Sequence, residues 1–249
     1  MIVAHRGASR DAPENTIPAF ELAWRQGADA IEGDFRLTKE GEIVCIHDKD
    51  TKRVAGRKLV VGESTLSELR ELDVGARRGK DFEGTTIPTI AEVFSTIPRQ
   101  KRIYIEIKCG AEIIPPLLEE IGKSGLEDEQ IVAICFDRDV LRDIKTEASQ
   151  YKTSWLCSIK RDESGETRPS LDEVLGVLED IDADGFSFGK DGVDRVFVEG
   201  IIAAGYEPHV WTVDNIETAA RMRAWGALST TTNVPGRMRK HLAKENRRP

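Results

Sequence analysis

The 249-residue chain is predicted to fold as a (β/α)₈ TIM barrel. β-like runs alternate with helical patterns along it, which is typical of parallel strands joined by crossover helices. Eight such runs remain when a ninth, at 43–47, is taken as the antiparallel return of a hairpin. The chain contains neither the glycine-rich G-x-G-x-x-G motif after the first strand nor a P-loop. A doubly wound nucleotide-binding sheet is therefore the less favoured alternative.

The predicted strands are short runs rich in β-branched and aromatic residues. They lie at residues 2–6, 30–37, 43–47, 102–108, 131–136, 152–158, 185–189, 207–213 and 227–231. Only residues 38–42 separate the second run from the third, which predicts a hairpin with a two-residue turn at Glu40 and Gly41. In that register His47 stands opposite Asp34 and on the same face of the hairpin.

Apolar residues at helical spacing predict helices between most of the strands. These helices are expected at 16–27, 65–72, 89–97, 111–124, 137–149, 170–180, 192–204 and 214–225. Residues 49–88 show little regular pattern beyond one short helix, and several glycines punctuate them. We expect this segment to be an excursion over the mouth of the barrel, within one domain that spans 1–249.

Composition limits the classes of function. The net charge of −8 repels polyanions, so nucleic acid is not expected as a partner. No run approaches the roughly 18 apolar residues of a membrane span, so stable membrane insertion is not expected either. The chain begins in a strand-like run without a signal sequence, and its four cysteines are far apart. These features predict a cytoplasmic protein, and they leave the oligomeric state open.

A cluster of carboxylates is predicted at the mouth of the barrel. Glu32 and Asp34 are two apart on an otherwise apolar run, so both face the same side of one strand. Glu106 and Lys108 repeat this pattern near the carboxyl end of another strand, which is the catalytic end of such a barrel. Buried acids require a compensating cation, and oxygen ligands suit Mg²⁺, Ca²⁺ or Mn²⁺. One divalent cation, foremost Mg²⁺ or Ca²⁺, is therefore predicted; the alternative is salt bridges to Arg36 or Lys108.

Two histidines and an arginine are expected at the same mouth. His5 ends the first strand, which neighbours the second in a closed barrel, and His47 faces the acids in the predicted hairpin register. Imidazole has an unperturbed pKa of roughly 6.5 and suits proton transfer near neutral pH. The guanidinium of Arg6 suits a phosphate, or alternatively an ion pair with one of the acids. We interpret His209 and His241 as structural.

Motifs along most of the chain resemble the glycerophosphodiester phosphodiesterase family. They are His5-Arg6-Gly7, Pro13-Glu14-Asn15-Thr16 with Phe20, the run 27–34, the run 38–41, His47-Asp48, and the runs 69–75, 87–89, 105–108 and 210–213. The resemblance implies a TIM barrel with a small insertion. It also implies hydrolysis of glycerophosphodiesters to glycerol 3-phosphate and an alcohol.

The resemblance further implies a role for each matching residue. Glu32, Asp34 and Glu106 are expected to bind the metal. His5 and His47 are expected to act as the acid–base pair, and Arg6, Lys108 and Trp211 to contact the substrate. The sequence does not decide which histidine is acid and which is base, with a slight preference for His47 as the base.

Two departures from the family pattern stand out. Residues 49–54 lack the usual leucine and Arg-Thr pair, and Asn233 stands where an aspartate is usual in the last strand motif. Asn233 replaces a carboxylate by an amide but removes no expected metal ligand.

Two other functions are kept as alternatives. The first is a lysophospholipase D or phosphoinositide phospholipase-like activity on the same barrel, for which no amphipathic membrane-binding segment is evident. The second is a non-catalytic barrel that binds phosphorylated ligands. Retention of both candidate histidines and all three acids argues against the second.

Overall fold

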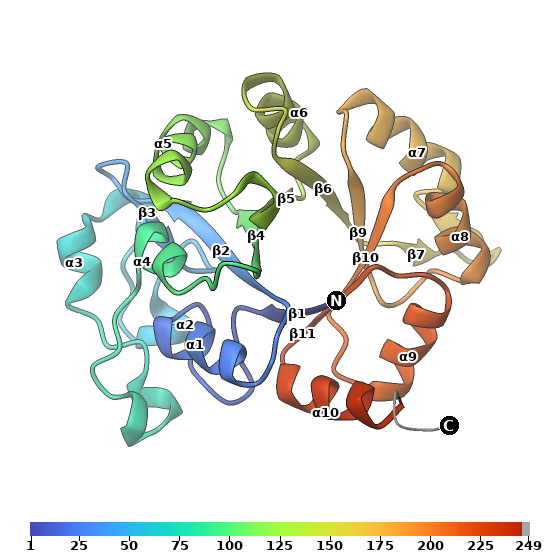
Figure 1. Ribbon diagram of the computed structural model, residues 1–249. Helices are drawn as coiled ribbons and strands as arrows, with labels where there is room; N and C mark the ends of the chain where they lie inside the picture. The colour runs from blue at the N-terminus through green and yellow to red at the C-terminus, as the bar shows by residue number, and fades with distance from the viewer. Residues whose placement is uncertain (246–249) are drawn as a thin grey trace.

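The computed structural model describes residues 1–245, in which eight parallel strands form a closed barrel inside a ring of helices (Figure 1). Around the ring these strands are β1 (Ile2–His5), β2 (Ala30–Leu37), β4 (Arg102–Ile107), β5 (Ile131–Cys135), β6 (Lys152–Cys157), β9 (Gly185–Gly189), β10 (Glu207–Trp211) and β11 (Ser229–Thr232). β1 pairs in parallel with both β2 and β11, which closes the ring. The predicted TIM barrel is confirmed.

Side chains along each strand point alternately outward and into the barrel, so the protein has two apolar cores. Side chains such as Ile31, Phe35 and Ile105 pack outward in a large apolar layer between strands and helices. The opposite faces point into the barrel, where a smaller apolar cluster fills part of the interior: Val3, Ala30, Tyr104, Val132, Ile134 and Leu156. Because successive residues of a strand alternate between faces, Glu32 and Asp34 share the inward face with Ala30, and Glu106 shares it with Tyr104.

The ring of helices consists of α1 (Ile17–Arg25), α4 (Ile90–Ser95), α5 (Ile114–Ser124), α6 (Arg138–Glu147), α7 (Leu171–Asp180), α8 (Arg195–Ala203), α9 (Ile216–Ala224) and α10 (Pro235–Glu245). Several begin at a side-chain cap, such as Thr89 and Ser170, whose hydroxyls accept hydrogen bonds from the backbone N–H groups of Glu92 and Glu173. The helix α10 follows the last strand of the barrel. Its sequence is strongly basic, and Met238 is its buried apolar anchor.

The hairpin that follows β2 differs from its prediction. β3 (Ile43–Cys45) is antiparallel to β2, but Phe35 pairs with Cys45 and Leu37 with Ile43. The loop contains three residues, 39–41, because Gly41 adopts a left-handed conformation with φ 87°. A three-residue loop with glycine in that position is a standard alternative to the two-residue turn. The predicted register, with His47 opposite Asp34, is therefore wrong by one residue.

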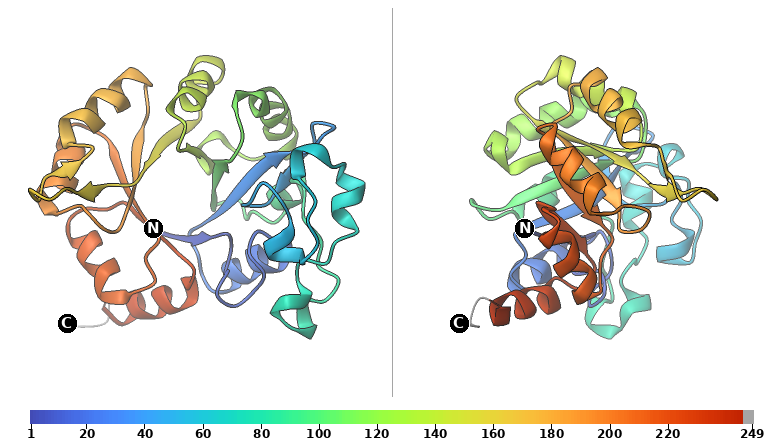
Figure 2. Two further views of the ribbon diagram at one scale, coloured as in Figure 1. Left: turned by 180° about the vertical axis from the view of Figure 1, so that it is seen from behind. Right: turned by 90° about the vertical axis from the view of Figure 1, so that its right-hand side faces the viewer.

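Residues 49–88 form a layer of short elements with its own core. The elements are α2 (Lys52–Ala55), η1 (Val61–Glu63), α3 (Leu66–Arg70), η2 (Ala76–Arg78) and η3 (Lys80–Phe82). Their apolar side chains, including Val61, Leu69 and Val74, pack on Val44 and Ile46 beside β3. In the side view of Figure 2, α2 and the hairpin of β7 (Lys160–Arg161) and β8 (Thr167–Arg168) lie toward the end of the barrel away from the N-terminus.

Within residues 1–245, none of the helices is long and apolar enough to cross a membrane.

Candidate active site at the mouth of the barrel

Three carboxylates meet on the inner face of β2 and β4. Asp34 and Glu106 are direct neighbours in the parallel register, and Glu32 lies one step away on the same face. Each contributes an oxygen, and these oxygens all lie within 4.8 Å of one another. The three side chains are buried, with residue exposures of 2%, 0% and 7% for Glu32, Asp34 and Glu106. The cluster predicted from strand periodicity therefore exists, and we refer to it as the acid triad.

The chemistry of the acid triad fits a divalent cation. Glu32 Oε1 and Asp34 Oδ1 are buried and accept no hydrogen bond in the described structure. Burial, together with the charges of Asp34 and Glu106, raises the pKa of Glu32 well above its ordinary value. Burial and the charge of Asp34 raise the pKa of Glu106 to about 7. Unpartnered carboxylate oxygens of this kind are suitable ligands for Mg²⁺, Ca²⁺ or Mn²⁺.

The salt-bridge alternative is realised only in part. Lys108 Nζ donates to Glu106 Oε1 at 2.6 Å and lies 3.6 Å from Asp34 Oδ1. Arg36 turns away instead and donates to the backbone carbonyls of His47 and Lys108. The ammonium of Lys108 and a divalent cation can both occupy this site, because a bound phosphate would add negative charge that compensates them.

Arg6 connects the acid triad to the loop after β1. Its backbone N–H donates to Glu32 Oε2 at 2.9 Å. Its guanidinium Nε lies 3.1 Å from Asp34 Oδ2, and Nη1 donates to Glu14 Oε1 at 3.0 Å. This tight turn requires glycine at position 7, where φ is 78° and a side chain would collide with the backbone of Ala19. The ion pair expected as an alternative role for Arg6 is therefore present.

Asn15 fixes the orientation of Asp34. Asn15 Nδ2 donates to Asp34 Oδ2 at 2.8 Å, and Asn15 Oδ1 accepts from the backbone N–H of Asp34 at 3.2 Å. Asn15 adopts a left-handed φ of 57°, which asparagine tolerates better than most residues. The cap of α1 comes from Thr16, whose hydroxyl accepts from Ala19 N–H. Asn15 therefore faces the site, and Thr16 begins the helix.

A hydrogen-bond chain sets the tautomer of His5. Asn233 donates its backbone N–H and its Nδ2 to the two oxygens of Asp214, each at 2.8 Å. Because a carboxylate only accepts, the amide oxygen of Asn233 must face His5 Nδ1, at 2.8 Å. Nδ1 therefore carries the hydrogen, and Nε2 is free to accept, 4.0 Å from Glu32 Oε2. Burial and the neighbouring charge of Arg6 lower the pKa of His5.

His47 lies two residues beyond β3 and reaches the site from there. His47 Nδ1 lies 2.7 Å from Asp48 Oδ1. Arg53, from α2, donates to Asp48 Oδ2 at 2.7 Å and also holds both oxygens of Glu14. The hydrogen bond from Arg53 lowers the pKa of Asp48 to about 2. His47 therefore has an ionised carboxylate at Nδ1, whereas His5 has a neutral amide.

These groups surround one pocket of about 160 Å³, which we call the triad pocket. Its polar side is formed by His5, Arg6, Glu32, His47, Glu106 and Lys108. Its apolar side is formed by Tyr104, Ile134, Phe136, Leu156 and Trp211. Asp34 does not line the pocket but contacts Arg6 and Lys108. The predicted site residues are thus brought together.

Trp211 has an unusual position in this pocket. Its Nε1 is buried and has no hydrogen-bond partner among the described residues. Its ring meets Phe136 edge to face, with centroids 5.7 Å apart. Sequence reasoning missed Phe136 and Tyr104, although Tyr104 lies two residues before Glu106 on the same strand face. His209 also lines the pocket, but it is buried and its Nδ1 lies 2.8 Å from Ser229 Oγ, in keeping with a structural role.

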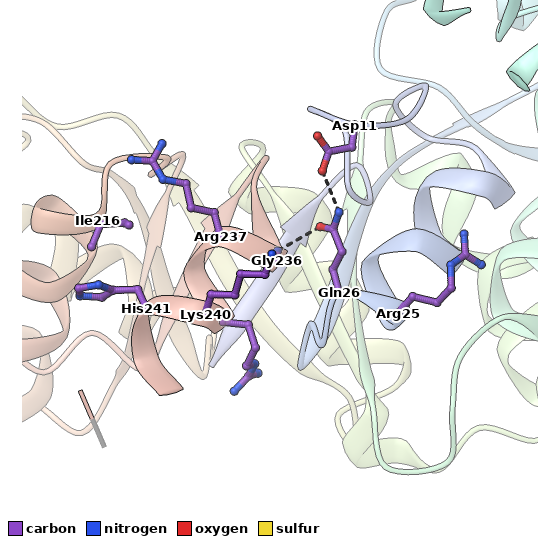
Figure 3. Close-up of a pocket in the computed structure, with 9 residues that line it drawn as sticks. Asp11, Arg25, Gln26, Ile216, Gly236, Arg237, Lys240 and His241 are labelled. Carbon is purple, nitrogen blue, oxygen red and sulfur yellow. Dashed lines mark hydrogen bonds between the residues drawn. The ribbon is translucent and has the colours of Figure 1, made fainter. Parts of the chain in front are cut away.

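A larger pocket, of about 710 Å³, lies outside the barrel between α1 and α10 (Figure 3). Gln26 bridges its two sides by donating to Asp11 and accepting from the backbone N–H of Gly236. Its other labelled side chains are mainly basic. Asp11 is the one carboxylate among its lining residues, so this pocket lacks the ligands of a cation site, and the candidate active site is the triad pocket.

Comparison with known proteins decides the family. Residues 5–237 match the model of the glycerophosphoryl diester phosphodiesterase family. The chain belongs to this family. It is accordingly a phosphoric diester hydrolase of the glycerophosphodiester phosphodiesterase type, as the motifs in the sequence suggested.

Individual relatives agree with this family. A glycerophosphodiester phosphodiesterase of Caldanaerobacter subterraneus subsp. tengcongensis is 34% identical over 239 residues, which cover 94% of each chain. A human lysophospholipase D is 32% identical over 127 residues, or 49% of this chain and 40% of that one. The fold is similar to that of an Oleispira antarctica phosphodiesterase in complex with its product sn-glycerol-3-phosphate, with a TM-score of 0.88, 24% identity and coverage of 98% and 96%.

Metal affinity in this phosphodiesterase should fall as the pH is lowered below about 7. With the pKa of Glu106 raised to about 7, the metal-free triad keeps a proton below that pH, and a cation must displace it. Below about pH 7, lowering the pH by one unit should therefore weaken cation binding roughly tenfold for each proton that the cation displaces. Calorimetric titration with Mg²⁺ or Mn²⁺ in two buffers of different ionisation enthalpy measures both the affinity and the released protons. Affinity that stays constant from about pH 5.5 to about pH 8 would contradict this coupling.

Proposed function

We propose that this enzyme hydrolyses glycerophosphodiesters to glycerol 3-phosphate and an alcohol, with one divalent cation held by Glu32, Asp34 and Glu106. The observation that carries the proposal is the convergence of three buried carboxylates and two oriented imidazoles on one pocket. The names of the relatives and the product bound to the Oleispira antarctica structure support the same substrate class. When bound, the cation would supply positive charge to the nonbridging oxygens of the phosphate.

The two histidines are proposed to transfer the protons. His5 is proposed as the base, because its Nδ1 donates to Asn233, which leaves the lone pair of Nε2 available to a substrate in the pocket. Its nitrogen would accept the proton of the attacking oxygen, from the glycerol 2-hydroxyl or from a water. His47 is proposed as the acid, because its Nδ1 lies 2.7 Å from the carboxylate of Asp48, which orients the ring so that Nε2 can donate to the leaving alkoxide. This assignment is the reverse of the one that the sequence favoured.

Arg6, Lys108 and Trp211 are proposed to bind the substrate. The guanidinium of Arg6 and the ammonium of Lys108 flank the acid triad and supply hydrogen bonds to phosphate oxygens. The unpartnered Nε1 of Trp211 supplies a hydrogen-bond donor on the apolar side of the pocket. A buried donor without a partner is costly, so a substrate hydroxyl that accepts from Trp211 would remove that cost on binding.

Release of glycerol 3-phosphate from a panel of glycerophosphodiesters tests this proposal. Because Glu32 Oε1 and Asp34 Oδ1 are buried and accept no hydrogen bond among the described residues, turnover should stop after exhaustive chelation and return with Mg²⁺, Mn²⁺ or Ca²⁺. The panel contains glycerophosphodiesters of choline, ethanolamine, serine and glycerol. Full turnover in the presence of chelator would refute the metal assignment, and a response to zinc alone would indicate a different site chemistry.

A lysophospholipase D activity is the second candidate, and the partial match to the human enzyme favours it. The apolar side of the triad pocket, where Phe136 is 49% exposed, offers a surface for an acyl chain. A lysophospholipid added to the same panel separates the two activities. Hydrolysis of the lysophospholipid at a higher kcat/KM than any glycerophosphodiester would make it the main activity. Turnover of any diester would exclude the non-catalytic alternative.

A further inference from the structure

A second pocket adjoins the triad pocket on the side of β1. It has a volume of about 230 Å³ and shares His5 and Arg6 with the triad pocket. Its remaining lining residues are Ser9, Arg10, Glu14, Arg78, Asp214 and Asn233. We call it the arginine pocket. A diester whose phosphate lies against Arg6 would therefore extend into it with one of its two substituents.

The acids of the arginine pocket are already engaged by other partners. Glu14 accepts hydrogen bonds from Arg6 and Arg53; burial opposes its ionisation, but these arginines lower the pKa of Glu14 to about 2. The oxygens of Asp214 accept from Asn233 and from the hydroxyl of Thr232. Both carboxylates thus accept hydrogen bonds within the fold, Glu14 from two guanidinium groups and Asp214 from neutral groups.

The cations of Arg10 and Arg78 are not neutralised in this way. Neither guanidinium forms an ion pair with any residue of the described chain. Both residues are exposed, and both line the arginine pocket. In a protein with a net charge of −8, two unpaired guanidiniums beside the candidate base make a local positive site.

The fold holds both arginines in place from distant parts of the chain. The backbone N–H of Arg10 donates to the carbonyl of Asn233 at 3.2 Å, which ties the loop after β1 to the end of β11. Arg78 belongs to η2 in the 49–88 excursion, and its guanidinium donates to the carbonyl of Ser9. The turn before η2 requires Gly75, because a side chain there would overlap the carbonyl oxygen of Phe82. The excursion thereby brings a second cation to the pocket.

We propose that the arginine pocket binds an anionic group on the leaving alcohol. The favoured substrates would then be glycerophosphodiesters whose alcohol carries a second negative charge, as a carboxylate or a phosphate. The leaving oxygen would stay in the triad pocket, which His47 lines, and the rest of the alcohol would extend past Arg6, shared by both pockets, into the arginine pocket. Guanidinium groups bind both kinds of anion through charge-assisted hydrogen bonds. This inference rests on the proposed function.

Matched pairs of substrates test the inference. Glycerophosphoserine differs from glycerophosphoethanolamine by one carboxylate, and a phosphorylated glycerophosphoglycerol differs from glycerophosphoglycerol by one phosphate. The ratio of kcat/KM within each pair should favour the anionic member by about tenfold or more in the wild type, since a charge-assisted hydrogen bond contributes about that factor. Arg10→Gln and Arg78→Gln should each lower this ratio several-fold, and the double variant should abolish it. Added salt should also lower the ratio.

Two controls separate this role from a structural one. Arg99→Gln makes the same change of charge at an exposed position just before β4, at the opposite end of the barrel, and should leave both ratios unchanged. Arg78→Lys keeps the positive charge and should retain part of the preference. The arginine variants could lose kcat/KM equally on both members of a pair, or the wild type could show no preference for the anionic member. Either result would overturn the proposal that the arginine pocket binds an anionic group, while the proposed function stands. If no diester of the panel is cleaved, the proposed function fails and this inference fails with it.

Discussion

Changing His5 or His47 to alanine should lower kcat for a glycerophosphodiester by about 10²- to 10⁴-fold, the usual contribution of a positioned proton-transfer group. Each imidazole is held at Nδ1, by Asn233 or by Asp48. Neither ring belongs to a packed core layer, since their side chains are 18% and 32% exposed. The fold and the affinity for the cation should therefore survive both substitutions. Steady-state kinetics and melting temperatures of the variants measure the two effects.

Substrates with different leaving groups distinguish the two roles. With an acidic phenol as leaving group, loss of the acid should matter little, so His47→Ala should recover most of its activity. Loss of the base should still be severe, so His5→Ala should not recover. The double variant should lose much less than the product of the single losses, because groups that act together are non-additive. His241→Ala, which changes a histidine outside the barrel, is the matched control. A kcat near that of the wild type in His5→Ala and His47→Ala would refute the acid–base roles of the two histidines.

Neutralising any member of the acid triad should weaken cation binding by more than about 100-fold. Residues that only support a metal ligand typically contribute about 10- to 100-fold to affinity, and Glu32, Asp34 and Glu106 are the proposed ligands themselves. The changes are Glu32→Gln, Asp34→Asn and Glu106→Gln, and activity at a fixed low concentration of cation should fall in parallel. Binding isotherms with Mn²⁺ provide the measurement. Affinity within about threefold of the wild type in all three variants would exclude the triad as the cation site.

The stability of the metal-free variants gives an independent signature. The pKa of Glu32 is raised well above its ordinary value of 4.5, mainly by burial. Above that value the unfolded chain releases this proton while the folded chain retains it, so Glu32 costs the fold more stability as the pH rises. Glu32→Gln should therefore raise the melting temperature in chelator, increasingly at higher pH.

Asp34→Asn should have the opposite effect on stability. Asp34 is a buried partner of both Arg6 and Lys108, and its neutralisation removes one of the two carboxylates that compensate each cation, leaving Glu14 for Arg6 and Glu106 for Lys108. The melting temperature of metal-free Asp34→Asn should therefore fall. A large loss of stability in metal-free Glu32→Gln would instead indicate that the acid triad is a salt-bridge network.

The parts of the site that could be predicted depend on strand geometry. The two-residue period of a strand places Glu32 and Asp34 on one face whatever the loops do, and Glu106 follows from the parallel register. The hairpin register depended on the conformation of Gly41, which sequence spacing does not reveal, and the prediction was one residue off. His47 still lines the pocket because it lies beyond the end of β3.

Strand geometry could not predict the site residues that come from separate loops. Arg10, Arg78 and Phe136 come from three distant segments, and no local spacing connects them before the barrel closes. The family resemblance pointed to Trp211, but its unpartnered nitrogen is visible only in three dimensions. The single domain over 1–249 and the cytoplasmic location stay predictions.

The pairing of β1 with both β2 and β11 sets the order in which function arises during translation. β1 precedes the other strands of the barrel along the chain, so one of its edges stays open until β11 has been made. The bond between His5 and Asn233 spans 228 positions, so it cannot form on a nascent chain that ends before β11. Such a chain would already contain the acid triad and both histidines, but His5 would lack its anchor. The growing polypeptide should therefore remain inactive until β11 emerges, and until then the open edge of β1 is exposed to chaperones and to other chains.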